Sequence, residues 1–261
     1  MATDSSLSGR KIFFLCLPLW VVEDFKDELI QMEYEVYHHP DHKAISKIVS
    51  MYPESILFIN LDSTVKESEW DRLIRALLPK IQENDIAVGV MSSDHSKSLV
   101  EKYVLEFKCQ AGFISMRQGT RKISQKIVQL IQALKARGRR RYVRASCAFD
   151  KRGRFNLQKD GRYGKGIILD ISSAGMACQL EESDESNVKL SKNEALDDIQ
   201  LRLGPKITSI SATVVGVRQD VRPVYVMIFD PKTGSAVKAK VYEFIKQTLQ
   251  DAFLKQIPDK R

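Results

Sequence analysis

The feature that most constrains the fold of this 261-residue chain is a change of hydrophobic pattern at Gly138. Before it, short apolar runs alternate with longer amphipathic segments, which is typical of a parallel sheet covered by helices. After it, short β-branched and apolar runs follow one another, which is typical of a small barrel. The glycine also follows Lys135 and Arg137, which suit a helix C-terminus. We therefore expect two domains that meet at residue 138.

The first domain is expected to be an α/β domain over residues 10–137, with a flavodoxin-like five-stranded parallel sheet. The expected strands are 11–17, 35–38, 55–61, 86–91 and 112–116. The expected helices, in which apolar residues recur at helical spacing, are 22–32, 44–51, 69–82, 99–107 and 123–136. The polar residues 1–9 are expected to form a disordered tail.

The second domain is expected to be all-β over residues 138–261, with six strands that close into a small barrel. The expected strands are 142–149, 166–171, 176–180, 199–203, 207–217 and 224–229. Residues 181–198 are acidic and mostly without period, so a long loop is expected there. A final helix over 237–253 should cover one barrel end with the apolar residues Val241, Phe244, Ile245, Leu249 and Phe253.

The basic charge of the chain is confined to the second half. Residues 1–134 carry 16 lysines and arginines against 18 acidic residues, and the whole chain carries 41 against 33. The remainder therefore has a net charge of +10, and residues 135–165 account for all of it. Such a segment should attract a polyanion.

Several functional classes are disfavoured by the residue inventory. Residues 1–9 are polar, so we expect no secretory leader, and the apolar run 12–19 is too short to cross a bilayer. We therefore expect a cytoplasmic protein without a membrane span. The four cysteines lack metal-binding spacing, so we expect neither a metal site nor a cofactor. All four histidines lie in the first half, so no imidazole is expected beside Ser172, Cys147 or Cys178. Binding is therefore expected rather than catalysis.

Two motifs in the second half point to a nucleotide ligand. The first is the arginine run Arg139-Arg140-Arg141-Tyr142-Val143-Arg144, and the second is Asp170-Ile171-Ser172-Ser173-Ala174-Gly175. Arginine presents planar forked donors that match phosphates and the guanine O6/N7 edge. An Asp and a Ser at a strand turn can form hydrogen bonds with further donors and acceptors of a nucleotide.

These residues, with Phe229-Asp230 before a closing helix, resemble the PilZ family over about residues 138–255. The resemblance implies a bacterial receptor for the second messenger cyclic di-GMP, of the kind that regulates motility or virulence. It implies that Arg140 and Arg144 hold phosphate and guanine, with Arg139 and Arg141 adding positive field. It implies that Asp170 accepts from guanine N1 and N2, that Ser172 reaches a phosphate, and that Gly175 lets the backbone turn beside the ligand.

The first half resembles a degenerate two-component receiver. Asp62 follows the third expected strand and Ser92 follows the fourth, but Cys16-Leu17-Pro18-Leu19 stands where a receiver has its magnesium-binding acidic pair. Arg117 stands near the position of the receiver lysine. We expect this domain to contact a protein partner rather than to accept phosphate.

The leading hypothesis is an effector in which ligand binding orders the arginine linker and repositions the two domains. One alternative is a nucleic-acid-binding protein that uses the basic segment 135–165, although aromatic residues are sparse there and nucleic acid is the less favoured partner. A second alternative is a phosphorylatable response regulator with Asp62 as acceptor. The sequence leaves open the stoichiometry of the ligand, the oligomeric state and the downstream partner.

Overall fold

The computed structural model describes residues 9–147 and 152–259, which divide into two compact units. The first unit consists of Met1–Arg141 with Gln250–Arg261, and the second consists of Tyr142–Leu249. The expected tail lies outside the described residues except for Gly9. The division lies close to the boundary expected at residue 138, but the end of the chain groups with the first unit.

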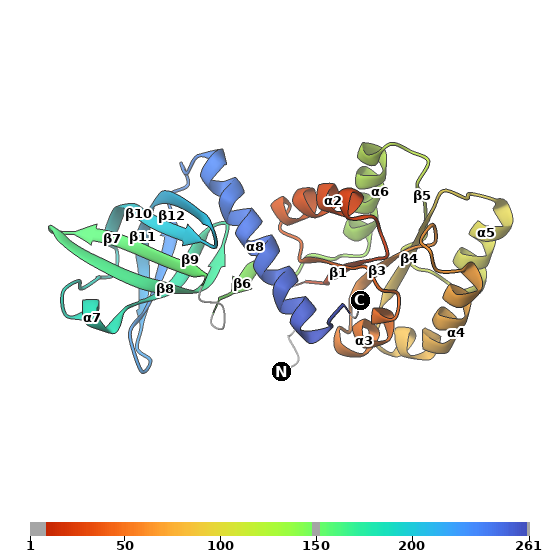
Figure 1. The fold of residues 1–261 in the computed structure, drawn as a ribbon, viewed down its shortest axis with the longest axis horizontal. Helices are drawn as coiled ribbons and strands as arrows, with labels where there is room; N and C mark the ends of the chain where they lie inside the picture. Colours follow the sequence, from red (N-terminus) through yellow and green to blue (C-terminus); the bar gives the residue numbers. More distant parts are fainter. Residues whose placement is uncertain (1–8, 148–151, 260–261) are drawn as a thin grey trace. The chain divides into compact units, whose positions relative to one another are not determined.

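The first unit contains a five-stranded parallel sheet in the order β2-β1-β3-β4-β5 (Figure 1). This is the flavodoxin-like order, so the predicted fold of the first half is confirmed. The strands are β1 (Ile12–Leu15), β2 (Val36–His39), β3 (Ile56–Asn60), β4 (Ala87–Ser92) and β5 (Phe113–Ser115).

Helices cover both faces of this sheet (Figure 1). Helix α6 and helix α2 pack on one face, where their aliphatic side chains join Ile12, Phe14 and Phe58 in one hydrophobic core. Because both faces are covered, β1 to β4 are buried along their whole length, which explains their continuous apolar runs. The helices are α2 (Leu19–Gln31), α3 (Ala44–Met51), α4 (Glu67–Glu83), α5 (Lys97–Glu101) with the π-helical η1 (Lys102–Glu106), and α6 (Thr120–Ala133).

The edge strand β2 carries two buried histidines, His38 and His39, which are 7% and 1% exposed. His38 Nε2 lies 3.1 Å from the Leu17 carbonyl oxygen, and His39 Nε2 lies 3.2 Å from the Ile257 carbonyl oxygen. Burial lowers the pKa of His38 to about 4, so the ring is neutral at pH 7.

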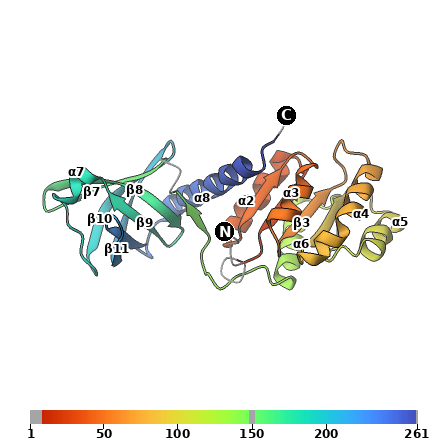
Figure 2. The ribbon, with the colours of Figure 1, turned by 90° about the horizontal axis from the view of Figure 1, so that it is seen from below.

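The second unit is a closed antiparallel barrel of six strands, in the order β8-β7-β10-β11-β12-β9, with β9 pairing back to β8 (Figures 1 and 2). A seventh strand, β6, adds to the outer edge of β8. The predicted barrel is confirmed. The strands are β6 (Arg144–Ser146), β7 (Gly153–Lys159), β8 (Arg162–Ser172), β9 (Gly175–Leu180), β10 (Ala195–Leu203), β11 (Lys206–Arg218) and β12 (Val224–Phe229).

One barrel strand, β7, was not predicted. Its burial alternates residue by residue, but only Phe155 and Leu157 are apolar among the inward-facing positions, and the outward positions are polar. Two apolar side chains are too few for a clear alternating signal. The predicted strand 142–149 is instead the short β6, and residues 148–151 lie outside the described part of the chain. The predicted acidic loop contains one short helix, α7 (Glu182–Glu185).

The last helix, α8 (Ser235–Gln256), belongs partly to each unit. In the barrel unit, a side chain added at Gly153 would lie 3.4 Å from the Phe244 ring, so α8 covers the interior there as predicted. Phe253 behaves differently from the prediction. It packs among Phe13, Tyr37 and Tyr52, with ring centroids 5.0 to 6.5 Å apart in this cluster. Phe253 is therefore core of the first unit.

In the described part of the chain, no helix has the length and apolar character that crossing a membrane requires.

Candidate functional site

The two sequence motifs meet in the barrel because β6 pairs with β8. In this antiparallel pair, Arg144 is opposite Ser172, and Ser146 is opposite Asp170. Ser172 in turn is opposite Gly175 across the tight connection from β8 to β9. One corner of the barrel therefore contains Arg144 from the first motif and Asp170, Ser172 and Gly175 from the second.

This corner contains a pocket of about 350 Å³ that is confined to the barrel unit. Four predicted site residues line it: Arg144, Asp170, Ser172 and Gly175. Strands β11 and β12 supply much of the remaining wall, including Arg218 and Ile228, which is 49% exposed. The volume lies at the small end of the range for ligand pockets, roughly 300 to 1,000 Å³.

Arg144 and Asp170 form an ion pair across the pocket rim. The guanidinium Nη1 lies 4.0 Å from the carboxylate Oδ1, and the side chains are 55% and 34% exposed. At this distance and exposure the pair contributes little to stability. Both groups are therefore available for a ligand at small cost.

Ser172 holds the turn between β8 and β9. Its side chain is largely buried, its Oγ accepts from the Ala174 N–H at 3.3 Å, and its hydroxyl donates to the Gly175 carbonyl at 3.2 Å. The hydroxyl proton would have to turn away from Gly175 to reach a phosphate. The present role of Ser172 is to fix the turn that positions Asp170.

Gly175 is required by a close approach of two strands. A Cβ at this position would lie 2.2 Å from the Met227 carbonyl oxygen of β12. The φ angle of Gly175 is not among the positive ones, so a left-handed backbone is not what requires glycine here. The absent side chain lets β9 close against β12 and form the pocket floor.

The cysteines near the site are buried thiols. Cys178 is 0% exposed, and burial together with the nearby Asp170 charge raises the pKa of its thiol. Cys147 is also a buried cysteine. The Cys178 thiol is poorly suited to nucleophilic chemistry, because its burial disfavours the thiolate. No group of three His, Cys, Asp or Glu residues that could hold a metal ion occurs in the described residues.

Two lining residues were not assigned to the site from the sequence: Arg218, and Tyr142, which lies inside the arginine run. Arg218 is the last residue of β11 and is opposite Val224 across the hairpin to β12. It is exposed and separated from both motifs by more than 40 positions. No local signal distinguishes such a residue from a solvated charge, and only barrel closure brings it to the pocket.

The remaining arginines of the first motif lie in the other unit. The division between the units falls between Arg141 and Tyr142, so Arg139, Arg140 and Arg141 group with the first unit and Arg144 with the barrel. All four are exposed. The arginine motif therefore spans the junction between the two units.

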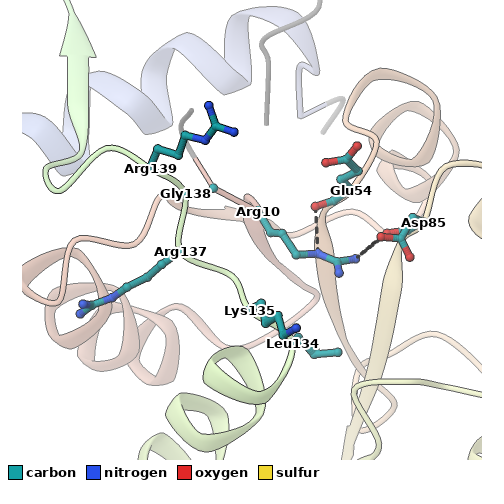
Figure 3. A pocket seen from close by; sticks show the side chains of 9 residues that line it. Arg10, Glu54, Asp85, Leu134, Lys135, Arg137, Gly138 and Arg139 are labelled. Atoms are coloured by element: carbon teal, nitrogen blue, oxygen red, sulfur yellow. Dashed lines mark hydrogen bonds and ion pairs between the residues drawn. The ribbon is translucent and has the colours of Figure 1, made fainter. Parts of the chain in front are cut away.

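Arg139 lines a second pocket, of about 440 Å³, at the amino ends of the first unit's strands (Figure 3). Arg10 is the anchor of this pocket. Its Nε donates to the Glu54 carbonyl at 3.0 Å, and its Nη2 lies 3.5 Å from the Asp85 carboxylate. Its main-chain N–H donates to the Ala136 carbonyl at 2.8 Å. These contacts fix the chain just before Gly138.

Arg137 points away from this pocket in Figure 3. It stacks over the Tyr34 ring, 5.4 Å from the centroid, and donates to the Met32 carbonyl at 3.3 Å. Because both Arg10 and Arg137 are engaged in structural contacts, the positive charges around this pocket do not converge on one point. We assign the pocket a structural role in holding the start of the arginine run.

The carboxyl ends of the first unit's strands differ from a phosphorylatable receiver. Asp62 lies two residues beyond β3, and its carboxylate accepts from Ser92 Oγ at 2.7 Å, Ser93 N–H at 2.7 Å and Ser93 Oγ at 2.6 Å. Asn60 ends the strand and donates to the Cys16 carbonyl at 3.0 Å. Cys16 and a buried Leu17 stand where magnesium would need carboxylates.

No known family profile and no curated protein matches this sequence. Solved structures do match. The PilZ domain with c-di-GMP of YcgR from Escherichia coli has 18% identity and a TM-score of 0.40, covering 46% of this chain and 99% of that one. The K. pneumonia MrkH–c-di-GMP complex has 20% identity and a TM-score of 0.37, covering 46% and 57%.

The Bacillus subtilis inhibitor of motility MotI/DgrA has 16% identity and a TM-score of 0.34, covering 42% of this chain and 50% of that one. The match to YcgR in complex with c-di-GMP also covers only 50% of that chain. The chain thus matches about half of the length of the YcgR, MrkH and MotI/DgrA chains and nearly all of the separate PilZ domain of YcgR, and it is similar to PilZ domain proteins.

Proposed function

We propose that this protein is an effector that binds cyclic di-GMP in the barrel pocket. The observation that carries the proposal is the convergence of Arg144, Asp170 and Ser172 at one pocket, although the two motifs are separated by 25 residues. An anionic ligand with a guanine edge needs a forked cation beside a carboxylate acceptor. The pocket supplies both, and Arg218 adds a second cation.

Binding would proceed by exchange of partners at the Arg144–Asp170 pair. The guanidinium would turn to a phosphate or to guanine O6/N7, while the Asp170 carboxylate accepts from guanine N1–H and N2–H. Each charge-assisted hydrogen bond contributes about 1.5 to 3 kcal/mol, so four or five such contacts are sufficient for micromolar affinity, which requires about 8 kcal/mol.

The arginine run gives this site a route to the other unit. Arg140 groups with the first unit and Arg144 with the barrel, so a ligand held by both would restrict how the units move. A ligand shifts such an equilibrium only if it binds one arrangement more tightly. We propose that cyclic di-GMP orders the segment 139–143 and thereby selects one arrangement, with Arg139 and Arg141 contributing positive potential.

Titration calorimetry tests the ligand assignment. Cyclic di-GMP, GTP and cyclic di-AMP should be compared on the wild type, Arg144→Ala and Asp170→Ala. Selective binding of cyclic di-GMP that both substitutions abolish is the expected result. Loss with Arg144→Ala alone, without preference among the nucleotides, would reduce the pocket to a generic anion site.

Small-angle scattering tests the coupling separately. Curves with and without cyclic di-GMP should differ for the wild type and coincide for Arg140→Ala. If the wild-type curves superimpose while calorimetry shows binding, the domain repositioning is wrong and the receptor assignment stands.

The output surface is proposed to lie on the first unit and to contact a protein partner. Leu19 and Trp20 begin α2 and are 62% and 71% exposed. Large exposed aromatic and aliphatic side chains of this kind are typical anchors of protein interfaces. A photo-cross-linking residue at position 20 should capture one partner in a cyclic di-GMP-dependent way. The same residue placed at exposed Lys97, on another helix, should not.

A further inference from the structure

The outer face of the barrel carries another positively charged pocket, which shares no lining residue with the pocket of Arg144 and Asp170. It has a volume of about 310 Å³ and lies across β8, β7, β10 and β11. Three cationic side chains line it: Arg154 from β7, Arg202 from β10 and Lys165 from β8. Neither sequence motif includes any of them.

The pairing of the strands fixes how these cations meet. Arg154 and Arg202 are directly opposite each other in the β7–β10 ladder. Directly opposite residues have Cα atoms about 4.5 to 5.5 Å apart, and like charges in such positions are destabilising. The register therefore places two arginines side by side on the outer face of the barrel, and an anion bound between their side chains would relieve their repulsion.

Only one carboxylate in the lining partly neutralises this pair. Glu181 Oε1 lies 3.3 Å from Arg154 Nη1, while both side chains remain 39% to 45% exposed. Within the described residues, Arg202 and Lys165 have no acidic partner for their side chains. Three cations against one carboxylate give the pocket a net charge of +2.

The floor of the pocket offers neutral hydrogen-bonding groups. Asn156 is opposite Lys165 on one side and Gln200 on the other. The Asn156 side chain donates to Gln200 Oε1 at 3.0 Å, which leaves the Gln200 amide donors to face outward. Both amides are exposed and can contact oxygens of a ligand held by the arginines.

We propose that this pocket binds a phosphate monoester. The net charge of +2 matches the charge of such a group, which is about −1.5 to −2 at pH 7. Two opposed arginine side chains can donate to several oxygens of one tetrahedral phosphate. A ligand with a single carboxylate fits less well, because its one negative charge would leave one cation uncompensated. The phosphate could be that of a small metabolite or that of a phosphorylated side chain on a partner protein.

The experiment is a calorimetric titration of the full-length protein with inorganic phosphate, adenosine 5′-monophosphate, a phosphoserine hexapeptide and its unphosphorylated form. Dimethyl phosphate, a monoanion, serves as the charge control. The phosphomonoester probes should bind at pH 7.5 and weaken at pH 5.5, because the second phosphate pKa lies near 6. Preference for the nucleotide assigns the site to a small molecule, and preference for the peptide assigns it to a phosphorylated partner.

Variants localise the binding. Arg202→Ala should weaken it by about tenfold or more, since it removes a charge-assisted fork. Arg202→Lys should retain part of the affinity, and Lys192→Ala, which removes an exposed lysine outside the pocket, should change nothing. All three should keep wild-type affinity for cyclic di-GMP, so failure of either site is recognised separately.

A variant-free measurement completes the test. In amide NMR spectra of the wild type, the side-chain NH₂ signals of Asn156 and Gln200 should shift on addition of phosphate. The proposal is overturned if no phosphomonoester binds, if dimethyl phosphate binds equally well, or if Arg202→Ala leaves the affinity unchanged.

Discussion

The Arg144 guanidinium lies 4.0 Å from the Asp170 carboxylate, so the cation of one motif faces the anion of the other at the rim of the barrel pocket. The pair is more than one third exposed on both sides, so its contribution to stability is between about 0 and 1 kcal/mol. Its significance is that the two groups are held close together before any ligand arrives.

Because this ion pair is weak, substitutions in it should lower ligand affinity much more than they lower the stability of the fold. Arg144→Ala and Asp170→Asn should each lower the affinity for cyclic di-GMP by at least about tenfold, because each removes a charge-assisted contact. Both should leave the melting temperature within a few degrees of the wild type. A large loss of stability in either variant would show that the pair is structural. Calorimetry and thermal melting on the same samples give both values.

Arg218 should act as a third contact for the ligand. Its position on the β11 side of the pocket places a fork across from the two motifs. Arg218→Ala should weaken binding of cyclic di-GMP by about tenfold or more, and Arg218→Lys should restore only part of it, because lysine lacks the fork. Lys192→Ala is the control for loss of one positive charge. Unchanged affinity in Arg218→Ala would remove this residue from the site.

Gly175→Ala should destabilise the barrel. The added methyl group would lie 2.2 Å from the Met227 carbonyl oxygen, so β9 and β12 must separate. Overpacking of this kind costs about 1 to 3 kcal/mol. The matched control is Gly216→Ala in β11, where a Cβ meets nothing within 4 Å. Urea denaturation should show a lower midpoint for Gly175→Ala and a change of less than about 1 kcal/mol for Gly216→Ala.

Gln250 should stabilise the edge of the first unit's sheet. Its Oε1 accepts from the His38 N–H at 3.0 Å and its amide donates to the His38 carbonyl at 2.8 Å. These bonds occupy main-chain groups that an edge strand otherwise leaves open. Gln250→Ala should cost about 1 to 3 kcal/mol and increase hydrogen exchange at His38. Lys255→Ala, an exposed change on the same helix, should alter neither.

His38 should make the first unit less stable in mild acid. Burial lowers its pKa from 6.5 to about 4 in the folded protein. Above pH 6.5 both states are neutral and the full stability is present. As pH falls from 6.5 toward 4, His38 becomes protonated in the unfolded chain but stays neutral in the folded chain, so about 3 kcal/mol of the free energy of unfolding is lost. His38→Asn should flatten this pH dependence, while His95→Asn at an exposed position should retain it.

Much of the fold could be predicted because local patterns report burial. The parallel strands of the first half are buried on both faces, so they read as continuous apolar runs. The barrel strand β7 was not predicted, because its outward positions are Arg154, Asn156 and Gln158 and only two apolar residues lie between them. A short strand with polar residues on its outer face and two apolar residues on its inner face gives too weak an alternation of polar and apolar residues to be predicted.

Only those residues of the proposed site that belong to a local sequence motif could be predicted. Arg144, Asp170, Ser172 and Gly175 could be chosen because each belongs to a local motif that carries its own chemistry. Arg218 belongs to no such motif, and Tyr142 lies inside the arginine run without a role that the motif assigns. The close approach of the Met227 carbonyl oxygen to Gly175 could not be predicted either, because Met227 lies 52 positions further along the chain.

The sequence by itself determined the two fold classes and the motifs that supply most of the residues of the proposed site. Hydrophobic period and residue chemistry are local properties, so they can be read along the chain. Only the tertiary structure decided that the end of α8 seals the β2 edge through Gln250 and Phe253, and that Arg154 is opposite Arg202. Such contacts depend on strand register and on which surfaces meet in space, and no local pattern encodes either.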